Sequence, residues 1–476
     1  MPVSILEDQR MTIVWFRRDL RLRDNPALAA AVKAGAILPV YILEEENGCT
    51  IGGASKWWLH HSLKKLNESL DGKLHFFQGR ADVVLPKLAK VARATAVCWN
   101  DCYEPHFVAK DRAVTTALEQ MEVVVHRFNG TMLWEPNQIM KKDGTPYKIF
   151  APYLRAALAE KPPPPPAAAP RSIQYADAAT PGAVTLEKLQ LMPEIEWYKG
   201  IEASWEPGEE AAQKLLRNFV TRKLPQYAAE RNYPSHDILS RLSPHLHYGE
   251  ISPATIWQAI HKGSGHRDSV QKFTSEFVWR DFACYLLYHF PETAEESYNE
   301  RLKHLAWKYN GRLLRKWQKG QTGIPIVDAG MRQLWQTGYM HNRVRMITAS
   351  FLIKNLLTDW RTGAAWFMDC LVDADQAVNT MNWQWVAGTG LDAAPFFRVF
   401  NPVLQSKKYD PDATYITAYV PELKDLPKRY IHEPWLLPKK IAESAGFTPG
   451  KDYPLPCVDL QESKDAALKA FRETKR

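Results

Sequence analysis

KPPPPPAAAP (161–170) separates two parts of the chain whose residue patterns differ. A run of prolines lacks backbone donors, so it cannot form a helix interior and favours an extended polyproline conformation. Together with the Ala, Gly and Pro residues that follow, it predicts an interdomain connector over 136–206. Pro-rich segments can also be recognition ligands, but the connector interpretation is favoured. We therefore expect one domain over 11–135 and another over 207–476.

Before the connector, short β-rich runs alternate with longer amphipathic segments. The β-rich runs are TIVWF (12–16), ILPVYIL (37–43), LHFFQG (74–79), AVCWN (96–100) and EVVVHRF (122–128). Segments between them, such as SKWWLHHSLKKLNESL, place apolar residues at helical spacing. Five strands alternating with helices predict an α/β domain with a doubly wound parallel sheet. No GxGxxG follows the first run, so a dinucleotide fingerprint is missing there.

After the connector, the pattern is almost entirely helical. EEAAQKLLRNFVTRKLPQYAAER (209–231) and SVQKFTSEFVWRDFACYLLYHF (269–290) carry apolar residues three to four positions apart. Strand-like runs nearly vanish over the remaining sequence. The second half therefore predicts a large all-α domain packed onto or beside the α/β domain.

The bulk composition is that of a soluble globular protein, with 45% hydrophobic and 24% charged residues among 476. The formal net charge of +8 permits a polyanionic partner without demanding one. No stretch approaches the ~20 apolar residues of a membrane span, and MPVSILEDQR (1–10) has no apolar run of signal-peptide length. The six cysteines form no CxxC pair. We expect a monomeric cytoplasmic protein with no membrane partner.

Five motifs resemble the photolyase/cryptochrome family of blue-light flavoproteins. They are WFRRDLRLRDNPAL (15–28), Tyr227 with RLSPHLHYGEISP (241–253), WRDF (279–282), GIPIVDAGMRQLWQTGYMHNRVRM (323–346) and DADQAVNTMNWQW (373–385). The resemblance covers nearly the whole chain in the same order. It implies the α/β–connector–helical layout, FAD as cofactor, and either light-driven repair of UV-damaged DNA or light signalling.

The segment from Leu239 to Ser243 is a candidate phosphate site. The hydroxyls of Ser240 and Ser243, with backbone N–H groups at a helix start, can bind a phosphate, although Ser-Pro is also a common helix opening. The resemblance implies that FAD phosphates are held here. Leu239 stands where many relatives have Thr, so one hydroxyl contact is missing. The implied FAD contacts in this region are Tyr227, Leu239, Ser240, Arg241, Leu242 and Ser243.

Asp373 and Asp375 place two carboxylates two residues apart. Such a pair could suggest a metal site or an acid–base pair, but without clustered histidines it is a poor transition-metal site, and no metal is expected. The resemblance implies that Asp373, Ala374 and Asp375 lie by the flavin ring and ribose, with Arg345 as a carboxylate partner. It also places Asn379 beside flavin N5. An amide can donate a hydrogen bond to reduced flavin without adding negative charge, whereas plant cryptochromes carry Asp there.

Trp383 and Trp385 stand at i and i+2, so in a helix their rings point about 200° apart and serve different neighbours. Trp383 shares a face with Asn379, four residues earlier. The resemblance implies an electron relay in which excited, oxidised flavin takes an electron from Trp383, and the hole then moves to Trp360 and a surface-proximal Trp307. By spacing alone, each of these tryptophans would be interpreted as core packing.

Glu276, Trp279 and Arg280 fall at i, i+3 and i+4 and are expected on one helix face. Asn342 and Met346 are one turn apart on another. A surface Glu276–Arg280 ion pair is the alternative interpretation. The resemblance implies that the two faces wall a pocket for a flipped lesion.

Flipping, for which photolyases are a standard example, costs a few kcal/mol. Aromatic stacking returns about 1–3 kcal/mol per base, and Trp279 and Trp385 are the expected platforms. Glu276 and Asn342 are expected to bond the base edges, while Met346 adds an adaptable apolar contact. Phosphate pairing fixes position, and the expected contacts for DNA near the lesion are Arg231, Arg343, Gln405 and Lys408.

These identities resemble a cyclobutane pyrimidine dimer photolyase. The (6-4) photolyases carry a His pair where Asn342 and Met346 stand, and DASH-type cryptochromes have Tyr in place of Trp279 and Trp385. LSPHLHYGE and NPVLQ (401–405) are similar to plant cryptochromes, which hints at the class III bacterial group rather than class I. The alternatives are a cryptochrome photosensor without repair and a non-enzymatic nucleic-acid-binding protein.

The resemblance also implies an antenna chromophore on the α/β domain. Phe107 falls near the position of a Glu that binds folate in class I members, so that contact is missing here. Class III members hold folate by a different arrangement. We expect methenyltetrahydrofolate rather than a deazaflavin, and the sequence assigns it no residue.

Overall fold

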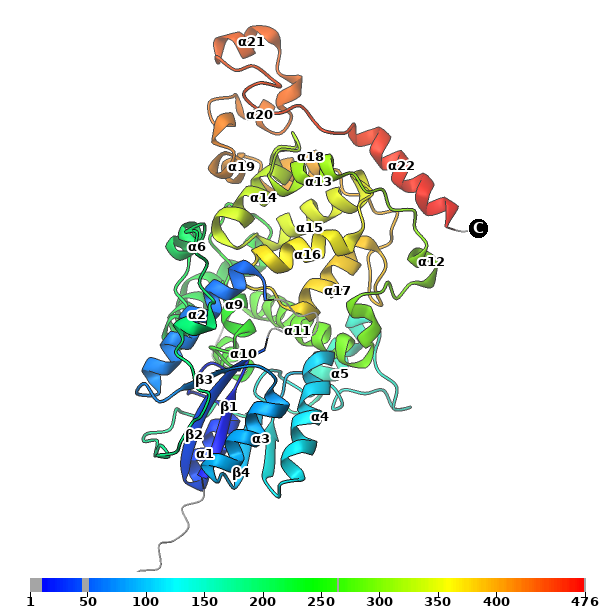
Figure 1. Ribbon diagram of the computed structural model, residues 1–476. Coiled ribbons are helices and arrows are strands. Elements are labelled where there is room, and N and C mark those ends of the chain that lie inside the picture. Colours follow the sequence, from blue (N-terminus) through cyan, green and yellow to red (C-terminus); the bar gives the residue numbers. More distant parts are fainter. Residues whose placement is uncertain (1–10, 45–50, 263–264, 475–476) are drawn as a thin grey trace, which may run out of the picture.

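The structure is a computed structural model that describes residues 11–44, 51–262 and 265–474. MPVSILEDQR, on which the signal-peptide prediction depends, lies outside the described residues. In Figure 1 the α/β domain (blue to cyan) forms the lower part and the helical domain (green to red) lies above it. Within the described ranges, no helix combines the length and apolar character needed to cross a membrane.

The α/β domain contains a five-stranded parallel sheet in the order β3-β2-β1-β4-β5. The strands are β1 (Met11–Phe16), β2 (Ala36–Leu43), β3 (His75–Gln78), β4 (Ala96–Asn100) and β5 (Val124–Phe128). Every residue of β1 and β2 is buried, as expected of parallel strands covered on both faces. The order reverses beside β1, so the predicted doubly wound sheet is confirmed.

The strands are linked by α1 (Pro26–Ala34), α2 (Gly53–Ser69), α3 (Ala81–Ala92) and α4 (Pro105–Glu119). Helix α1 begins where the sequence supplies a cap, because the Asn25 side chain accepts from the N–H of Leu28 and Pro26 occupies the first turn. In the register of the sheet, Ile13 lies beside Leu38 on one side and Val97 on the other. These side chains belong to a single apolar cluster under α3 and α4.

The connector returns across the sheet after the Pro-rich run. Tyr175 bridges Ile37 at the start of β2, and Val184 bridges Phe76 on β3. The Val184 bridge covers the edge strand β3, and the Tyr175 bridge covers the start of β2, so fewer backbone groups at this edge of the sheet are left unpaired. The range 136–206 also contains α5 (Phe150–Ala159), whose buried side chains join the core of the helical domain.

The helical domain is built from short and medium helices around buried aromatic clusters. Its helices are α6 (Lys199–Ser204), α7 (Glu209–Asn218), α8 (Tyr227–Glu230), α9 (Ser243–His247), α10 (Pro253–His261), α11 (Arg267–His289), α12 (Glu300–Lys303), α13 (Gly311–Gln318), α14 (Pro325–Thr337), α15 (Asn342–Ser350), α16 (Trp360–Cys370), α17 (Gln376–Ala387), α18 (Pro402–Tyr409), α19 (Thr414–Tyr419), α20 (Lys428–Ile431), α21 (Lys439–Ser444) and α22 (Leu460–Glu473).

Single turns complete the fold. They are the π-helical turns η2 (Phe219–Lys223) and η5 (Phe351–Asn355) and the 3-10 turns η1 (Glu187–Leu189), η3 (Leu224–Gln226), η4 (Pro291–Ala294), η6 (Pro421–Leu423) and η7 (Pro434–Leu436).

The two domains share a packed interface. Trp205, Tyr248 and Val372 of the helical half belong to one cluster with the side chains of β1, β2 and α2. Gly249 makes this approach possible, since its φ is +66° and a Cβ there would lie 2.0 Å from the Arg18 carbonyl oxygen. The buried Arg21 guanidinium donates to the Gly249 carbonyl at 2.9 Å across the same interface.

Candidate functional site

A cavity of about 960 Å³ lies between the two domains. Its α/β side includes Trp15, Arg18 and Phe107, and its helical side includes residues of α16 and α17. Ala374 and Asn379, two of the predicted flavin contacts, line it. The cavity is therefore large enough for a bulky planar ligand, and it reaches the seam between α16 and α17.

The wall of this cavity carries polar atoms that suit a ligand. Within the described part of the chain, Trp360 Nε1 and Gln376 Oε1 are buried without a hydrogen-bond partner. Buried polar groups normally have partners, so orphaned atoms at a cavity wall point to a bound group. The described residues contain no group of three or more His, Cys, Asp or Glu placed to hold a metal ion.

Arg345 and Asp373 form the ion pair that the sequence predicts. Arg345, on α15, reaches both carboxylate oxygens of Asp373 at 2.9–3.0 Å. The same guanidinium donates to the Met340 carbonyl at 2.7 Å and lies over the Tyr339 ring. The pair fixes the segment before α17 against α15.

Asp375 begins α17 as its N-cap. Its Oδ1 accepts from the N–H of Val378 at 2.9 Å, and its Oδ2 lies 3.5 Å from His247 Nδ1 and 3.8 Å from Arg18. Burial alone would raise the pKa of this carboxyl, but His247, Arg18 and Arg280 outweigh burial and hold the pKa well below its ordinary value. Asp375 is therefore an anion at neutral pH.

The predicted phosphate segment lies beside the Arg345 pair. Arg241 has a φ of +56° and stacks on Trp205, and it approaches the Tyr339 ring that also contacts Arg345. Tyr339 thus links residues 239–243 with Arg345 and Asp373. Helix α9 begins at Ser243 after Leu242, and among the described residues no side chain caps its first turn. The arrangement does not support the interpretation of Ser243 as a plain N-cap.

Tyr227, another predicted flavin contact, lies in an aromatic cluster outside the interdomain cavity. It opens α8 and packs edge-on against Phe219 and Phe273, with Arg231 over its ring. Neither Tyr227 nor the segment 239–243 lines the interdomain cavity. The structure therefore places the predicted flavin contacts in two groups, one at the α16–α17 seam and one near Tyr339 and Tyr227.

Asn379 and Trp383 share the face of α17 that packs on α16. The Asn379 amide donates to the Ala364 carbonyl at 3.0 Å, which leaves a second amide hydrogen and the oxygen for a ligand. Trp383 packs edge-on against Phe367 and directly over Gly363, where a Cβ would meet its ring at 2.2 Å. A glycine at 363 is thus required for this packing.

The three tryptophans of the predicted relay lie in one apolar cluster. Trp383 and Trp360 are 2% and 1% exposed, while Trp307 packs against the cluster from its half-buried edge. The two inner members of the predicted relay are therefore buried, and only its outermost member, Trp307, is partly exposed. Trp385 also packs on this cluster but stays half-buried, so the two neighbouring tryptophans differ in burial.

Predicted lesion and DNA residues from the end of α8, from α11 and from α15 gather in one cluster, together with Asn232 and Tyr409. Arg231 forms an ion pair with Glu276, which Lys272 also approaches at 3.2 Å. Arg343 donates to Asn232 Oδ1 at 2.7 Å and lies over the Tyr409 ring.

Met346 contacts Arg343 through its sulfur. Asn342 and Lys408 are exposed beside this cluster, and Gln405 lies on the same helix as Lys408.

Trp279 and Arg280 depart from the predicted shared face. Trp279 stacks on Phe150 with ring centroids 3.6 Å apart, so one of its faces is already covered. Arg280 turns away from Glu276 and donates to the Thr131 carbonyl and to Asp281. In the structure the Arg280 side chain thus leans toward the interdomain interface, and its place beside a lesion stays a prediction. The same geometry rules out the alternative Glu276–Arg280 pair.

Sequence reasoning missed the side chains that link the two domains to this site. Arg18, Glu104 and His247 surround Asp375, and Tyr339 joins the two groups of predicted flavin contacts. Arg18 and His247 lie within the quoted motifs, so the motifs themselves were the available signal. One sequence contains no information about which distant residues meet, and this is why they were not assigned.

Comparison with known proteins agrees with this architecture. Residues 12–171 match the family model described as DNA photolyase, and residues 273–473 match the FAD binding domain of DNA photolyase. The chain is 45% identical over 471 residues to a deoxyribodipyrimidine photo-lyase of Agrobacterium fabrum, with 98% of each chain covered. It is 36% identical to cryptochrome-2 of Arabidopsis thaliana over 98% of this chain and 79% of that protein.

Among solved structures, a bacterial class III photolyase from Agrobacterium tumefaciens is similar to this chain with a TM-score of 0.96 at 44% identity. The match covers 99% of this chain and 100% of the other. Both the sequence relatives and the fold extend over the α/β and the helical domain together. The chain therefore belongs to the photolyase/cryptochrome family, and its helical half is an FAD-binding domain of that family.

Proposed function

We propose that this protein repairs cyclobutane pyrimidine dimers in DNA by light-driven electron transfer from reduced FAD, as a photolyase of the class III type. The single observation that carries the proposal is the double role of α15. Arg345 on this helix pairs with Asp373 on the flavin side, while Arg343 and Met346 join the cluster with Glu276 and Tyr409. One helix thus carries a proposed flavin contact and proposed lesion contacts, which supports electron transfer between the two sites.

The cofactor and the protein have separate roles in the proposed reaction. Reduced FAD, when bound, supplies the light-excited electron that splits the cyclobutane ring and takes the electron back. Asp373 is held by Arg345 at the flavin site, and Asn379 presents an amide there without adding a charge. Trp383, Trp360 and Trp307 supply electrons from the protein when the flavin is oxidised. The chain needs no nucleophile or general acid, because it contributes position and electrostatics.

The DNA face holds the flipped bases. Trp385 and the free face of Trp279 stack on them, and each stacked base is worth about 1–3 kcal/mol. Glu276 and Asn342 bond the base edges, and Met346 supplies an apolar contact. Arg231, Arg343, Gln405 and Lys408 contact the backbone beside the lesion. The cations are only partly neutralised here, since Arg343 has an amide and an aromatic ring as partners.

A second chromophore is part of the proposal. Methenyltetrahydrofolate, bound between or on the domains, would pass absorbed light to FAD. The α/β side of the interdomain cavity, which includes Trp15, Tyr41 and Phe107, supports a planar ligand on that domain. Purified protein should show folate absorption besides flavin absorption, and extraction followed by mass spectrometry should distinguish a folate from a deazaflavin. We further propose a monomeric, cytoplasmic enzyme with domains at 11–135 and 207–476, which gel filtration and fractionation would test.

Illumination of the reduced protein with a defined thymine dimer tests the function directly. Single-stranded and double-stranded substrates should both be restored, whereas DNA with a (6-4) lesion should stay unrepaired. A protein that binds flavin and photoreduces it, yet restores neither substrate, would instead be a photosensor of the cryptochrome type. A protein without flavin absorption would contradict the proposal entirely.

A further inference from the structure

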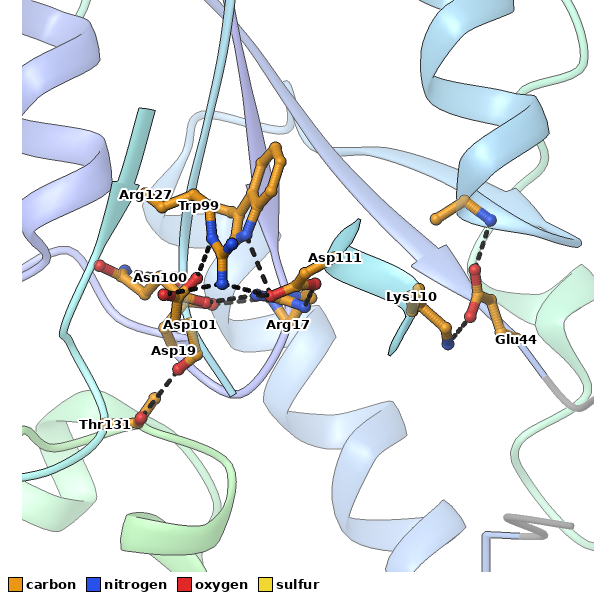
Figure 2. A network of polar contacts seen from close by, with 11 residues as sticks. Arg17, Asp19, Glu44, Trp99, Asn100, Asp101, Lys110, Asp111, Arg127 and Thr131 are labelled. Atoms are coloured by element: carbon orange, nitrogen blue, oxygen red, sulfur yellow. Dashed lines mark hydrogen bonds and ion pairs between the residues drawn. The ribbon is translucent and has the colours of Figure 1, made fainter. Parts of the chain in front are cut away.

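Two adjacent arginines follow β1 and serve different domains. Arg17 stays within the α/β domain, where it donates to both oxygens of Asp111 at 2.5 and 3.2 Å and to the Asn100 carbonyl at 2.6 Å. Figure 2 shows this guanidinium beside Asp111, which also accepts from the Trp99 indole. Arg17 thereby holds α4 against the ends of β1 and β4.

Arg18 points to the helical domain instead. Its guanidinium contacts Glu104, the residue before α4, and lies 3.8 Å from Asp375 Oδ2 at the start of α17. The side chains of Glu104 and Asp375 are 6% and 10% exposed. Arg18 is thus a cation from one domain placed between a carboxylate of its own domain and one of the other.

A second, small cavity of about 20 Å³ collects the same groups. Arg18, Glu104, Asp375, His247 and Arg280 line it. Two arginines and two carboxylates thus share this cavity, and Arg280 pairs in addition with a third carboxylate, Asp281. Removing one member of such a buried set leaves the remaining charges uncompensated, which is costly in a low-dielectric environment.

We propose that Arg18 is a positioning residue for the flavin site: from the α/β domain it neutralises Asp375 at the start of α17 and thereby raises the flavin reduction potential. This inference rests on the proposed function, because it requires FAD beside Asp375. Arg18 acts through Asp375 and Glu104, which are the groups that it touches. In this proposal the interdomain contact sets the flavin reduction potential as well as holding the two domains together.

The charge arrangement predicts opposite effects of two substitutions. Two-electron reduction leaves more negative charge on the flavin, so a carboxylate without its cation disfavours the reduced form. Arg18→Met leaves both Glu104 and Asp375 uncompensated and should weaken binding of reduced relative to oxidised flavin. Glu104→Gln removes a negative charge and frees Arg18 for Asp375, so it should strengthen binding of the reduced form. The double variant should return close to the wild type.

The test measures the flavin midpoint potential of the holoprotein by redox titration. We expect Arg18→Met to lower the relative affinity for reduced flavin about tenfold, which corresponds to about 30 mV for a two-electron couple. Glu104→Gln should shift the potential in the other direction, and Arg18→Lys should stay close to the wild type. Arg23→Met is the matched control, since Arg23 belongs to the same segment but pairs with the partly buried Glu209 and the exposed Glu210.

A measurement on the flavin-free protein tests the interaction of Arg18 with Asp375 separately from flavin binding. In the apoprotein, the unfolding equilibrium constants of Arg18→Met, Asp375→Asn and the double variant form a thermodynamic cycle. We expect the two changes to be non-additive by about tenfold, as is usual for contacting charges. Additive effects, or potentials that shift in the same direction for Arg18→Met and Glu104→Gln, would overturn the inference while repair by the wild type stands. A wild-type protein that binds no flavin would refute the proposed function and this inference with it.

Discussion

The two faces of α17 carry neighbouring tryptophans in opposite surroundings. Trp383 is almost fully buried and packs on Gly363 and Phe367 of α16, on the same face as Asn379. Trp385, two residues on, is half-buried at the margin of the same cluster. The first ring has its neighbours fixed by the core, whereas the second keeps surface available for a ligand.

This difference indicates that one helix can serve electron supply on one face and substrate binding on the other. A period of 3.6 residues turns the side chains at i and i+2 to different sides. Both faces depend on the same helix start at Asp375 and on the same end near Gly388, where φ is +83°. Substitutions on one face should therefore leave the other working, whereas changes at the helix ends should disturb both.

The largest effect is expected on the buried face. Trp383→Ala should lower the free energy of unfolding by about 3–5 kcal/mol, as for other buried aromatic side chains. Trp383→Phe keeps most of the packing but removes the indole, so photoreduction of oxidised flavin should be lost while pre-reduced enzyme still repairs. Flash photolysis and a repair assay on the same preparation check this, and a parallel loss of both activities would contradict the division between the faces.

The end of α17 should be nearly as sensitive. Lys354 of η5 is buried and donates to the Ala387 and Phe396 carbonyls at 3.1 and 3.0 Å. Lys354→Met would leave two buried acceptors unpaired, at about 1–3 kcal/mol each. Chemical denaturation should show this loss, and damaged-DNA binding should weaken too because the loop after α17 is released. If Lys354→Met bound damaged DNA as tightly as the wild type, Lys354 would have no role in holding that loop.

On the half-buried face the expected loss is in binding. Trp385→Ala should weaken affinity for dimer-containing DNA by about 1–3 kcal/mol, the value of one stacked base. Photoreduction should continue at the wild-type rate, since Trp383 is untouched. Trp279→Ala should behave in the same way, and fluorescence anisotropy with damaged and undamaged duplexes measures both. Slowed photoreduction in Trp385→Ala would show that the two faces are not independent.

The smallest expected effect is on the stability contributed by Asp375, at the start of α17, and it appears only at acid pH. The pKa of Asp375 is below its ordinary value in the folded protein, because His247, Arg18 and Arg280 outweigh the effect of burial. A carboxyl of this kind stabilises the fold above its unfolded pKa of about 3.9, and this contribution is lost as the pH falls below that value. Thermal unfolding between neutral and acid pH should thus show a steeper acid loss for the wild type than for Asp375→Asn. Equal slopes would mean that Asp375 is not held as an anion.

Sequence patterns anticipated the fold far better than the site. All five strands were anticipated from short β-rich runs, and the two fully buried ones, β1 and β2, are nearly continuous apolar runs, which is a local property. Motifs selected the right family and with it Arg345 as the partner of Asp373. The helix α5 within the connector and the direction of Arg280 were missed, since both depend on packing against distant segments.

The sequence by itself determined the alternation of strands and helices and the divergence of Trp383 and Trp385. Each of these follows from chain geometry over a few residues. Only the tertiary structure decided which groups meet: Arg18 with Asp375 across 357 positions, Arg231 with Glu276, and Trp279 with Phe150. Ion pairs and ring contacts act over a few ångströms in space, and neighbourhood in space is set by the packing of whole domains.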